Sequence, residues 1–175
     1  MANPTYTLIG TPQVVGSGGA SAITFSSIPA TYTDLLIKCS VRTDRTSSAN
    51  DYLKITINSG SSYSGIQLAG NGSSATSGTF SSIGATQYAG DVNGPTSTAN
   101  TFAPVDIYIP NYASSNAKSY SVESAFETNS TGGIVTLDAG LWSGTGAITQ
   151  IAFAPGVGTN FVQYSSFYLY GIKNN

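Results

Sequence analysis

Apolar and polar residues alternate along most of this 175-residue chain, as they do in strands that have one buried and one exposed face. The alternation is clearest in residues 35–41, 53–57, 105–109 and 120–122, where Leu, Ile, Val, Cys or Tyr occupies every second position. No stretch of 11 or more residues shows the 3.6-residue period of an amphipathic helix. The pattern therefore predicts an all-β protein in which helix makes up less than about 10% of the chain.

Turn-forming residues interrupt this alternation. Glycine occurs with small polar residues in Asn58–Ser62 and Ser130–Gly133, where a tight turn needs a positive φ angle. Pro29, Pro110 and Pro155 each mark the end of a strand, because proline lacks the N–H that pairs with a neighbouring strand. About ten strands separated by such turns are typical of an antiparallel β-sandwich or barrel. Besides the segments above, strands are predicted at residues 5–9, 20–25, 64–68, 79–88, 134–142, 148–154 and 163–172.

The length of the chain favours one domain. A chain of 175 residues can bury about two-thirds of its unfolded surface, so we expect a single domain over residues 1–175. Residues 70–101 have the fewest apolar and the most small side chains, which predicts a surface excursion containing one strand rather than a linker. The alternating apolar positions predict the core: Leu35, Ile37, Cys39, Val41, Leu53, Ile55, Ile57, Val105, Ile107, Ile109, Tyr120, Val122 and Phe126.

Charged residues are scarce. They make up 8% of the chain, against about 25% in an average domain, and the net charge is −2. Six Lys and Arg residues are a poor basis for binding phosphate groups, so we expect no nucleic-acid partner. A net charge near zero protects weakly against self-association, which favours a protein fixed in an assembly. The apolar runs are too short for a membrane helix and MANPTYTLIG lacks a secretory signal, so we expect cytoplasmic synthesis and no membrane partner.

Few residues of the chain are suited to catalysis. Histidine is absent, which removes the commonest general base and zinc ligand. Cys39 has no histidine to activate it, and it is expected to be buried and inert. We therefore expect no enzyme activity, no catalytic residue, no cofactor and no metal. The carboxylates weighed as an acid–base pair are Asp106, Glu123, Glu127 and Asp138, but nothing in the sequence indicates that their pKa values differ.

Two segments are candidates for contact with a partner. Residues 42–54 hold five of the 14 charged residues, and the alternative is a solvated loop with weak ion pairs. The C-terminal FVQYSSFYLYGI places alternate tyrosines on one face of a strand, where they can serve sheet packing, a subunit interface or glycan binding. The candidate contact residues are Arg42, Asp44, Arg45, Asp51, Lys54, Tyr164, Tyr168 and Tyr170.

The segments FSSIPATYTDLLIK, IYIPNY, AGLWS and LYGIK resemble small virion structural proteins of tailed bacteriophages, especially phages of cyanobacteria and other marine bacteria. The resemblance spans nearly the whole chain and rests on strand and turn segments, so it transfers no active-site residue. It implies a jelly-roll-like sandwich on the capsid surface: a head decoration, or cement, protein that binds the major capsid protein, commonly as a homotrimer. Other members of the group imply an alternative, a tail-fibre or appendage module that recognises host surface glycans.

Overall fold

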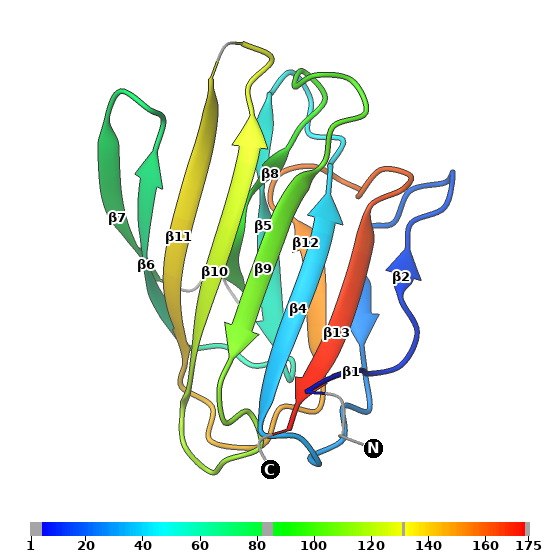
Figure 1. Cartoon of the computed structure of the whole chain (residues 1–175), viewed down its shortest axis with the longest axis vertical. Helices are drawn as coiled ribbons and strands as arrows, with labels where there is room; N and C mark the ends of the chain where they lie inside the picture. The colour runs from blue at the N-terminus through cyan, green and yellow to red at the C-terminus, as the bar shows by residue number, and fades with distance from the viewer. Residues whose placement is uncertain (1–4, 82–85, 131, 174–175) are drawn as a thin grey trace.

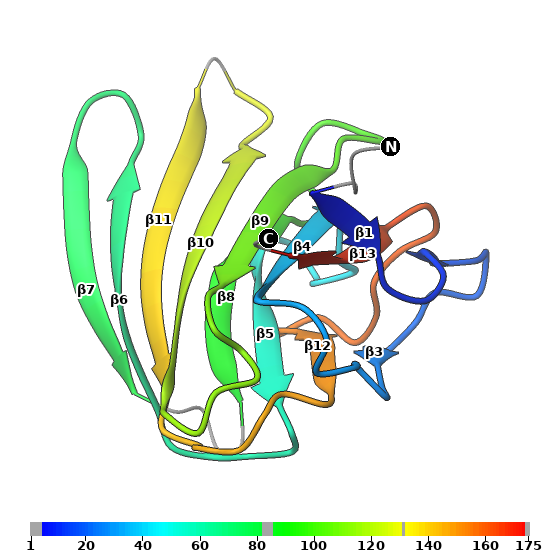
Figure 2. The ribbon, with the colours of Figure 1, turned by 60° about the horizontal axis from the view of Figure 1, so that its bottom comes forward.

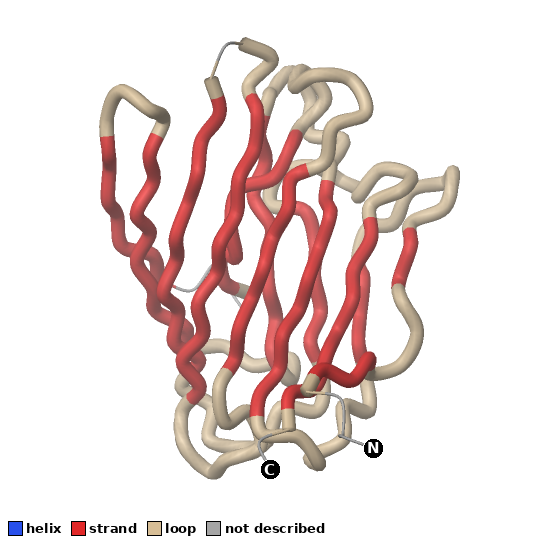
Figure 3. Tube along the Cα trace, viewed as in Figure 1, coloured by secondary structure: helices blue, strands red, loops and turns tan. Residues whose placement is uncertain are grey.

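The computed structural model describes residues 5–81, 86–130 and 132–173, which form two antiparallel β-sheets and contain no helix (Figure 3). The longer sheet faces the viewer in Figure 1, and the shorter sheet lies behind it. In spatial order the longer sheet consists of β1 (Tyr6–Leu8), β13 (Ser166–Ile172), β4 (Asp34–Val41), β9 (Ala103–Ile109), β10 (Lys118–Glu127), β11 (Gly133–Trp142), β6 (Tyr63–Gly70) and β7 (Ala75–Ser81), with β2 (Gln13–Val14) paired to β13. The shorter sheet consists of β3 (Ile23–Phe25), β12 (Ile151–Pro155), β5 (Asn50–Ile57) and β8 (Gln87–Asn93).

The alternating pattern forms the contact between the sheets. In β4, Leu35 and Ile37 are fully buried, whereas Lys38 is exposed on the opposite side of the longer sheet. Ile37 lies opposite Ile107 of β9, so the buried faces of neighbouring strands coincide. All thirteen side chains predicted for the core are buried, and the antiparallel β-sandwich predicted from the sequence is confirmed. The jelly-roll connectivity implied by the resemblance stays a prediction.

Aromatic side chains complete the core. Phe167 of β13 stacks on Phe153 of the shorter sheet, with 5.6 Å between the ring centroids. Phe161 meets Phe167 edge-on at 5.0 Å. All three rings are fully buried, and together they join the two sheets under β13.

Thirteen strands occur in the described residues, where about ten were predicted. The prediction of one strand in residues 70–101 is wrong, because β7 and β8 both lie there and belong to different sheets. The predicted strand at 79–88 spans both of them, and its residues 82–85 lie outside the described residues. The first four residues of β7, 75–78, were not predicted as a strand because they show no apolar alternation; seven consecutive pairs with β6 define β7 instead.

One end of the longer sheet, which we call the wing, consists of β11, β6 and β7. Figure 2 shows that β6 and β7 extend past the shorter sheet, and β7 is the free edge of the longer one. Leu137 of β11 lies opposite Leu68 of β6, and Ala139 lies opposite Ile66. The wing therefore has an inner surface, partly covered by β8, and an outer surface on the far side of the longer sheet.

Candidate functional site

The outer surface of the wing is apolar. Five aliphatic side chains on it are 38–63% exposed, although aliphatic side chains in strands are normally placed toward a core. Single exposed aliphatic residues are ordinary, but here they occupy neighbouring positions on two paired strands. With the alanine between them they make up the surface that we call the wing face: Ile66, Leu68, Val135, Leu137, Ala139 and Leu141.

The sheet pattern is inverted in the wing. In β11, Val135 and Leu137 face outward, whereas Thr136 and Asp138 are buried on the inner surface. β6 repeats the arrangement, with Ile66 and Leu68 exposed. Alternation alone would predict that the aliphatic side chains of β6 and β11 face the core. The sequence therefore indicates that these strands have an apolar face, but not that this face is exposed.

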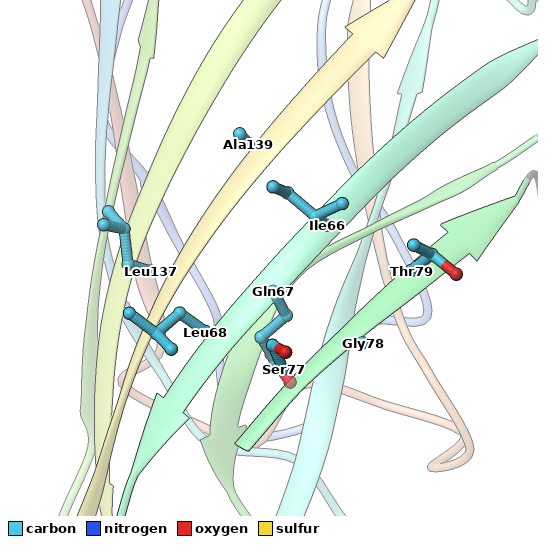
Figure 4. A pocket seen from close by; sticks show the side chains of 8 residues that line it. All are labelled: Ile66, Gln67, Leu68, Ser77, Gly78, Thr79, Leu137 and Ala139. Atoms are coloured by element: carbon cyan, nitrogen blue, oxygen red, sulfur yellow. The ribbon is translucent and has the colours of Figure 1, made fainter. Parts of the chain in front are cut away.

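A hollow of about 680 Å³ lies on the wing face (Figure 4). Ile66, Leu68 and Leu137 lie along one side of the hollow in Figure 4, and Ser77 and Thr79 of the edge strand β7 lie along the other. Among the described residues, no charged side chain lines this hollow. Its walls can pack against apolar groups and offer hydroxyl groups for hydrogen bonds.

A polar cluster lies beneath the wing face, between β11, β6 and β8. The Gln67 Nε2 donates a hydrogen bond to the Tyr88 Oη at 2.8 Å, and the Asn50 Nδ2 donates to the Asp91 Oδ1 at 3.3 Å. Asp138 is only 3% exposed, yet neither carboxylate oxygen accepts a hydrogen bond of good geometry from the described residues. A buried acid in this state is costly when it is ionised.

The surroundings of Asp138 favour its protonated form. Burial, reinforced by the negative charge of Asp91, raises the pKa of Asp138 to about 7, although the Gln67 side chain and the Gly90 N–H partly offset the shift. The pKa of Asp91 is also raised, chiefly by burial. The Tyr120 hydroxyl is a further buried group here for which the described residues supply no hydrogen-bond partner. Asp138 can therefore hold a proton near neutral pH.

The charged segment 42–54 proves to be largely structural. Arg42 is only 8% exposed, and its guanidinium donates hydrogen bonds to the carbonyl oxygens of Pro95 at 3.1 Å, Thr98 at 2.9 Å and Thr101 at 3.0 Å. These bonds hold the loop between β8 and β9. Its donors are used inside the fold, which favours a structural role for Arg42, and its contact with a partner stays a prediction.

Two acidic residues of the same segment anchor a second loop. Asp51 is fully buried and accepts hydrogen bonds from the N–H groups of Val157 at 3.0 Å and Gly158 at 2.9 Å, which favours a structural role for it too. Asp44 accepts N–H hydrogen bonds from Thr159 and Asn160. Desolvation raises the pKa of Asp44, but these hydrogen bonds outweigh it and lower the pKa below its usual value.

The two remaining cations of the segment are half-buried. Arg45 donates to the backbone oxygen of Asn50 at 3.1 Å, and Lys54 lies in β5 opposite Tyr88 of the edge strand β8. Of the five charged candidates, Arg45 and Lys54 therefore keep the most freedom to meet a partner.

The predicted tyrosine face is only partly formed. Tyr168 and Tyr170 share the outer face of β13, as expected. Tyr164 does not join them, because its φ angle of 74° breaks the extended backbone before β13 begins at Ser166. Tyr164 lies instead on a loop, with 68% of its surface exposed.

A second hollow, of about 490 Å³, lies on the outer surface near β13. It is lined by Tyr6, Tyr170 and Leu36, together with Lys38 and Asp106, which form an ion pair. Glu123 lies directly opposite Asp106, so two of the four carboxylates weighed as an acid–base pair lie side by side on the solvent-facing side of the longer sheet. Sequence analysis did not find this hollow because Tyr6, Leu36 and Tyr170 come from three separate strands.

Comparison with known proteins found no matching family model, no matching curated protein and no matching solved structure. Within the described residues, no group of three or more His, Cys, Asp or Glu side chains is placed to hold a metal ion. The same residues include no helix long and apolar enough to cross a membrane. The site is thus described by its own geometry: an uncharged wing face and a tyrosine-lined hollow on one side of an antiparallel β-sandwich.

Proposed function

We propose that this chain is a structural protein of a tailed-bacteriophage virion, and specifically a head decoration protein. It binds the major capsid protein on the outside of the head as a homotrimer, after synthesis in the host cytoplasm. Its role is binding rather than catalysis, and it needs no cofactor, nucleic acid or membrane. The segments FSSIPATYTDLLIK, IYIPNY, AGLWS and LYGIK support the class of protein.

The observation that carries the proposal is the wing face. An exposed, uncharged set of aliphatic side chains in a regular sheet suits a protein that is permanently covered in an assembly. An average soluble protein that diffuses freely would expose more charge at such a surface. The wing face therefore favours a structural role in a particle.

The test is reconstitution of particles that lack the protein. Purified chain is added to undecorated capsids, unbound protein is removed by sedimentation, and bound copies are counted relative to the major capsid protein. The expected result is saturable binding with a copy number in proportion to the capsid protein. A copy number in proportion to the tail proteins, with binding confined to the tail in electron micrographs, would refute the decoration role.

The tyrosine-lined hollow favours one alternative, a tail-fibre or appendage module that binds host surface glycans. Tyr6 and Tyr170 offer aromatic faces for sugar rings, and the Lys38–Asp106 pair offers hydrogen-bonding groups beside them. A glycan array, followed by a binding measurement with Tyr170→Ala, tests this role. Tyr164→Ala is the matched control, because Tyr164 is exposed but lies outside the hollow. Binding that is lost in Tyr170→Ala and retained in the control would support the alternative.

A further inference from the structure

The wing face has the sequence pattern of a buried surface. Alternate aliphatic residues in β6 and β11 are the pattern that, elsewhere in this chain, marks the side of a strand that packs on the other sheet. In the wing the same pattern faces outward. Some partner surface must therefore cover it if these side chains are to be buried as their neighbours are.

The size of the wing face suits an interface. Exposures of 38–63% for its five larger side chains amount to about 400–500 Å² of apolar surface, within the range in which the largest patch of a monomer is often functional. A stable interface buries about 800 Å² per partner, so the wing face can supply its apolar centre and the surrounding Ser and Thr side chains its rim.

The edge strand β7 continues this surface. Its seven residues contain no charged residue and no proline, and they pair with β6 without a bulge. Exposed edge strands usually carry a charged residue, a proline or a bulge, because each of these prevents association with another strand. β7 lacks them, so the surface remains open to association from the wing face to the edge of the sheet.

The absence of charge on the wing face indicates which partner covers it. Where copies of one chain meet around a symmetry axis, each side chain near the axis meets its own counterpart, so a charged residue there would face a like charge. Three charged side chains of the outer surface, Lys38, Asp106 and Glu123, lie on β4, β9 and β10, outside the wing. Glu123 is opposite Leu137, so charge begins at the border of the wing face and is absent within it. A foreign partner would not require this arrangement, because opposite charges could pair across such an interface.

We propose that a second copy of this chain covers the wing face, so that the homo-oligomer is held together by β11, β6 and the edge strand β7. The proposal rests on the proposed function in one respect: in the trimer suggested above, the three wing faces lie toward the common axis. The opposite end of the longer sheet, with the tyrosine-lined hollow, then remains free to contact the capsid.

Sedimentation velocity over the micromolar range tests this arrangement. The double variant Val135→Lys/Leu137→Lys places two charges on the wing face, and we expect self-association about 100-fold weaker or more. The matched control is Val14→Lys/Leu8→Lys, which makes the same replacements at the other end of the sheet. Val14 is 59% exposed against 63% for Val135, and Leu8 is 40% exposed against 48% for Leu137. Circular dichroism and Trp142 fluorescence verify that both variants are folded.

The expected result is that the wild-type chain and the control sediment as the same oligomer, whereas the wing variant sediments as a monomer. Equal association of wing variant and wild type would overturn the proposal, as would a wild-type chain that stays monomeric throughout. Capsid binding of the same proteins separates this inference from the proposed function. A wild-type monomer whose capsid binding is lost in the wing variant would assign the wing face to the capsid protein. An oligomer that needs the wing face but does not bind capsids would leave the inference standing and refute the decoration role.

Discussion

Replacement of Asp138 by asparagine should stabilise the protein at pH 8 and remove part of its pH dependence. The folded-state pKa of Asp138 is raised to about 7, whereas an aspartate in an unfolded chain titrates near 3.9. Between these values the folded state binds more protons than the unfolded state, so stability falls as the pH rises through this window. The amide that replaces the carboxyl group would keep the shape of the side chain and carry no charge at any pH.

The magnitude follows from the displaced pKa. From pH 5 to pH 7 the folded carboxyl loses its proton while the unfolded one is already largely ionised, which corresponds to about 2–3 kcal/mol of lost stability. Between pH 5 and pH 8 the stability of Asp138→Asn relative to wild type should therefore rise by that amount. The ionisable groups nearest Asp138, including Asp91 and the hydroxyls of Tyr88 and Tyr120, are present in both proteins, so the difference reports Asp138 together with its coupling to them.

Urea unfolding at pH 5, 6, 7 and 8, followed by the fluorescence of Trp142, measures this difference. Trp142 is buried and is the only tryptophan of the chain, so its emission reports unfolding. Glu123→Gln is the control, because it removes a carboxylate from the outer face of the longer sheet. Stability curves of wild type and Asp138→Asn that run parallel from pH 5 to pH 8 would refute the account of the buried acid.

Three further variants test the packing. Ile107→Ala should lower the free energy of unfolding by about 2–5 kcal/mol in urea unfolding, because Ile107 is fully buried between the sheets; a loss below about 1 kcal/mol would contradict its place in the core. Arg42→Ala should lower the free energy of unfolding by about 1–3 kcal/mol, because it leaves the carbonyls of the β8–β9 loop without a donor. Arg45→Ala removes a single hydrogen bond, to the Asn50 oxygen, and should lower it less; equal losses of stability would argue against the anchoring role of Arg42. Gly140→Ala should cost about 1–3 kcal/mol by differential scanning calorimetry, because a Cβ there would lie 2.1 Å from the Cζ atom of Tyr120, and an unchanged melting temperature would contradict that packing.

The parts of the fold that follow the ordinary alternation could be predicted from the sequence. Leu35 and Ile37 in β4 and Val105 and Ile107 in β9 lie on the expected face, because both strands have one side on the core and one in solvent. Most of β7 could not be predicted, since Ser, Thr and Gly carry no periodic signal; its order comes from pairing with β6 and from the stacking of Phe80 on Tyr88 of β8.

The candidate contact surfaces could be predicted only in part. The sequence shows the concentration of charge at 42–54, but Arg42 and Asp51 form their hydrogen bonds with loops that are distant from them along the chain. Their burial therefore has no local sequence signal. Tyr168 and Tyr170 were found because they share a strand face, and Tyr164 was misplaced because one positive φ angle ends the extended backbone before them.

The inverted face of β11 raises the question of what holds it in place. A shift of one residue would turn Leu137 inward and Asp138 outward, which would bury an aliphatic side chain and release a buried acid. Trp142 opposes that shift, because it is buried on the same side of β11 as Asp138. The chain fits closely around the indole ring: a Cβ at Gly144 would lie 2.1 Å from its Cζ2 atom, and one at Gly60 would lie 2.7 Å from its Nε1 atom. A shifted strand would expel this side chain, the largest in the chain, from its site. Trp142 thus fixes the face of β11, and the same constraint keeps the aliphatic side chains of the wing face outside, where a partner can reach them.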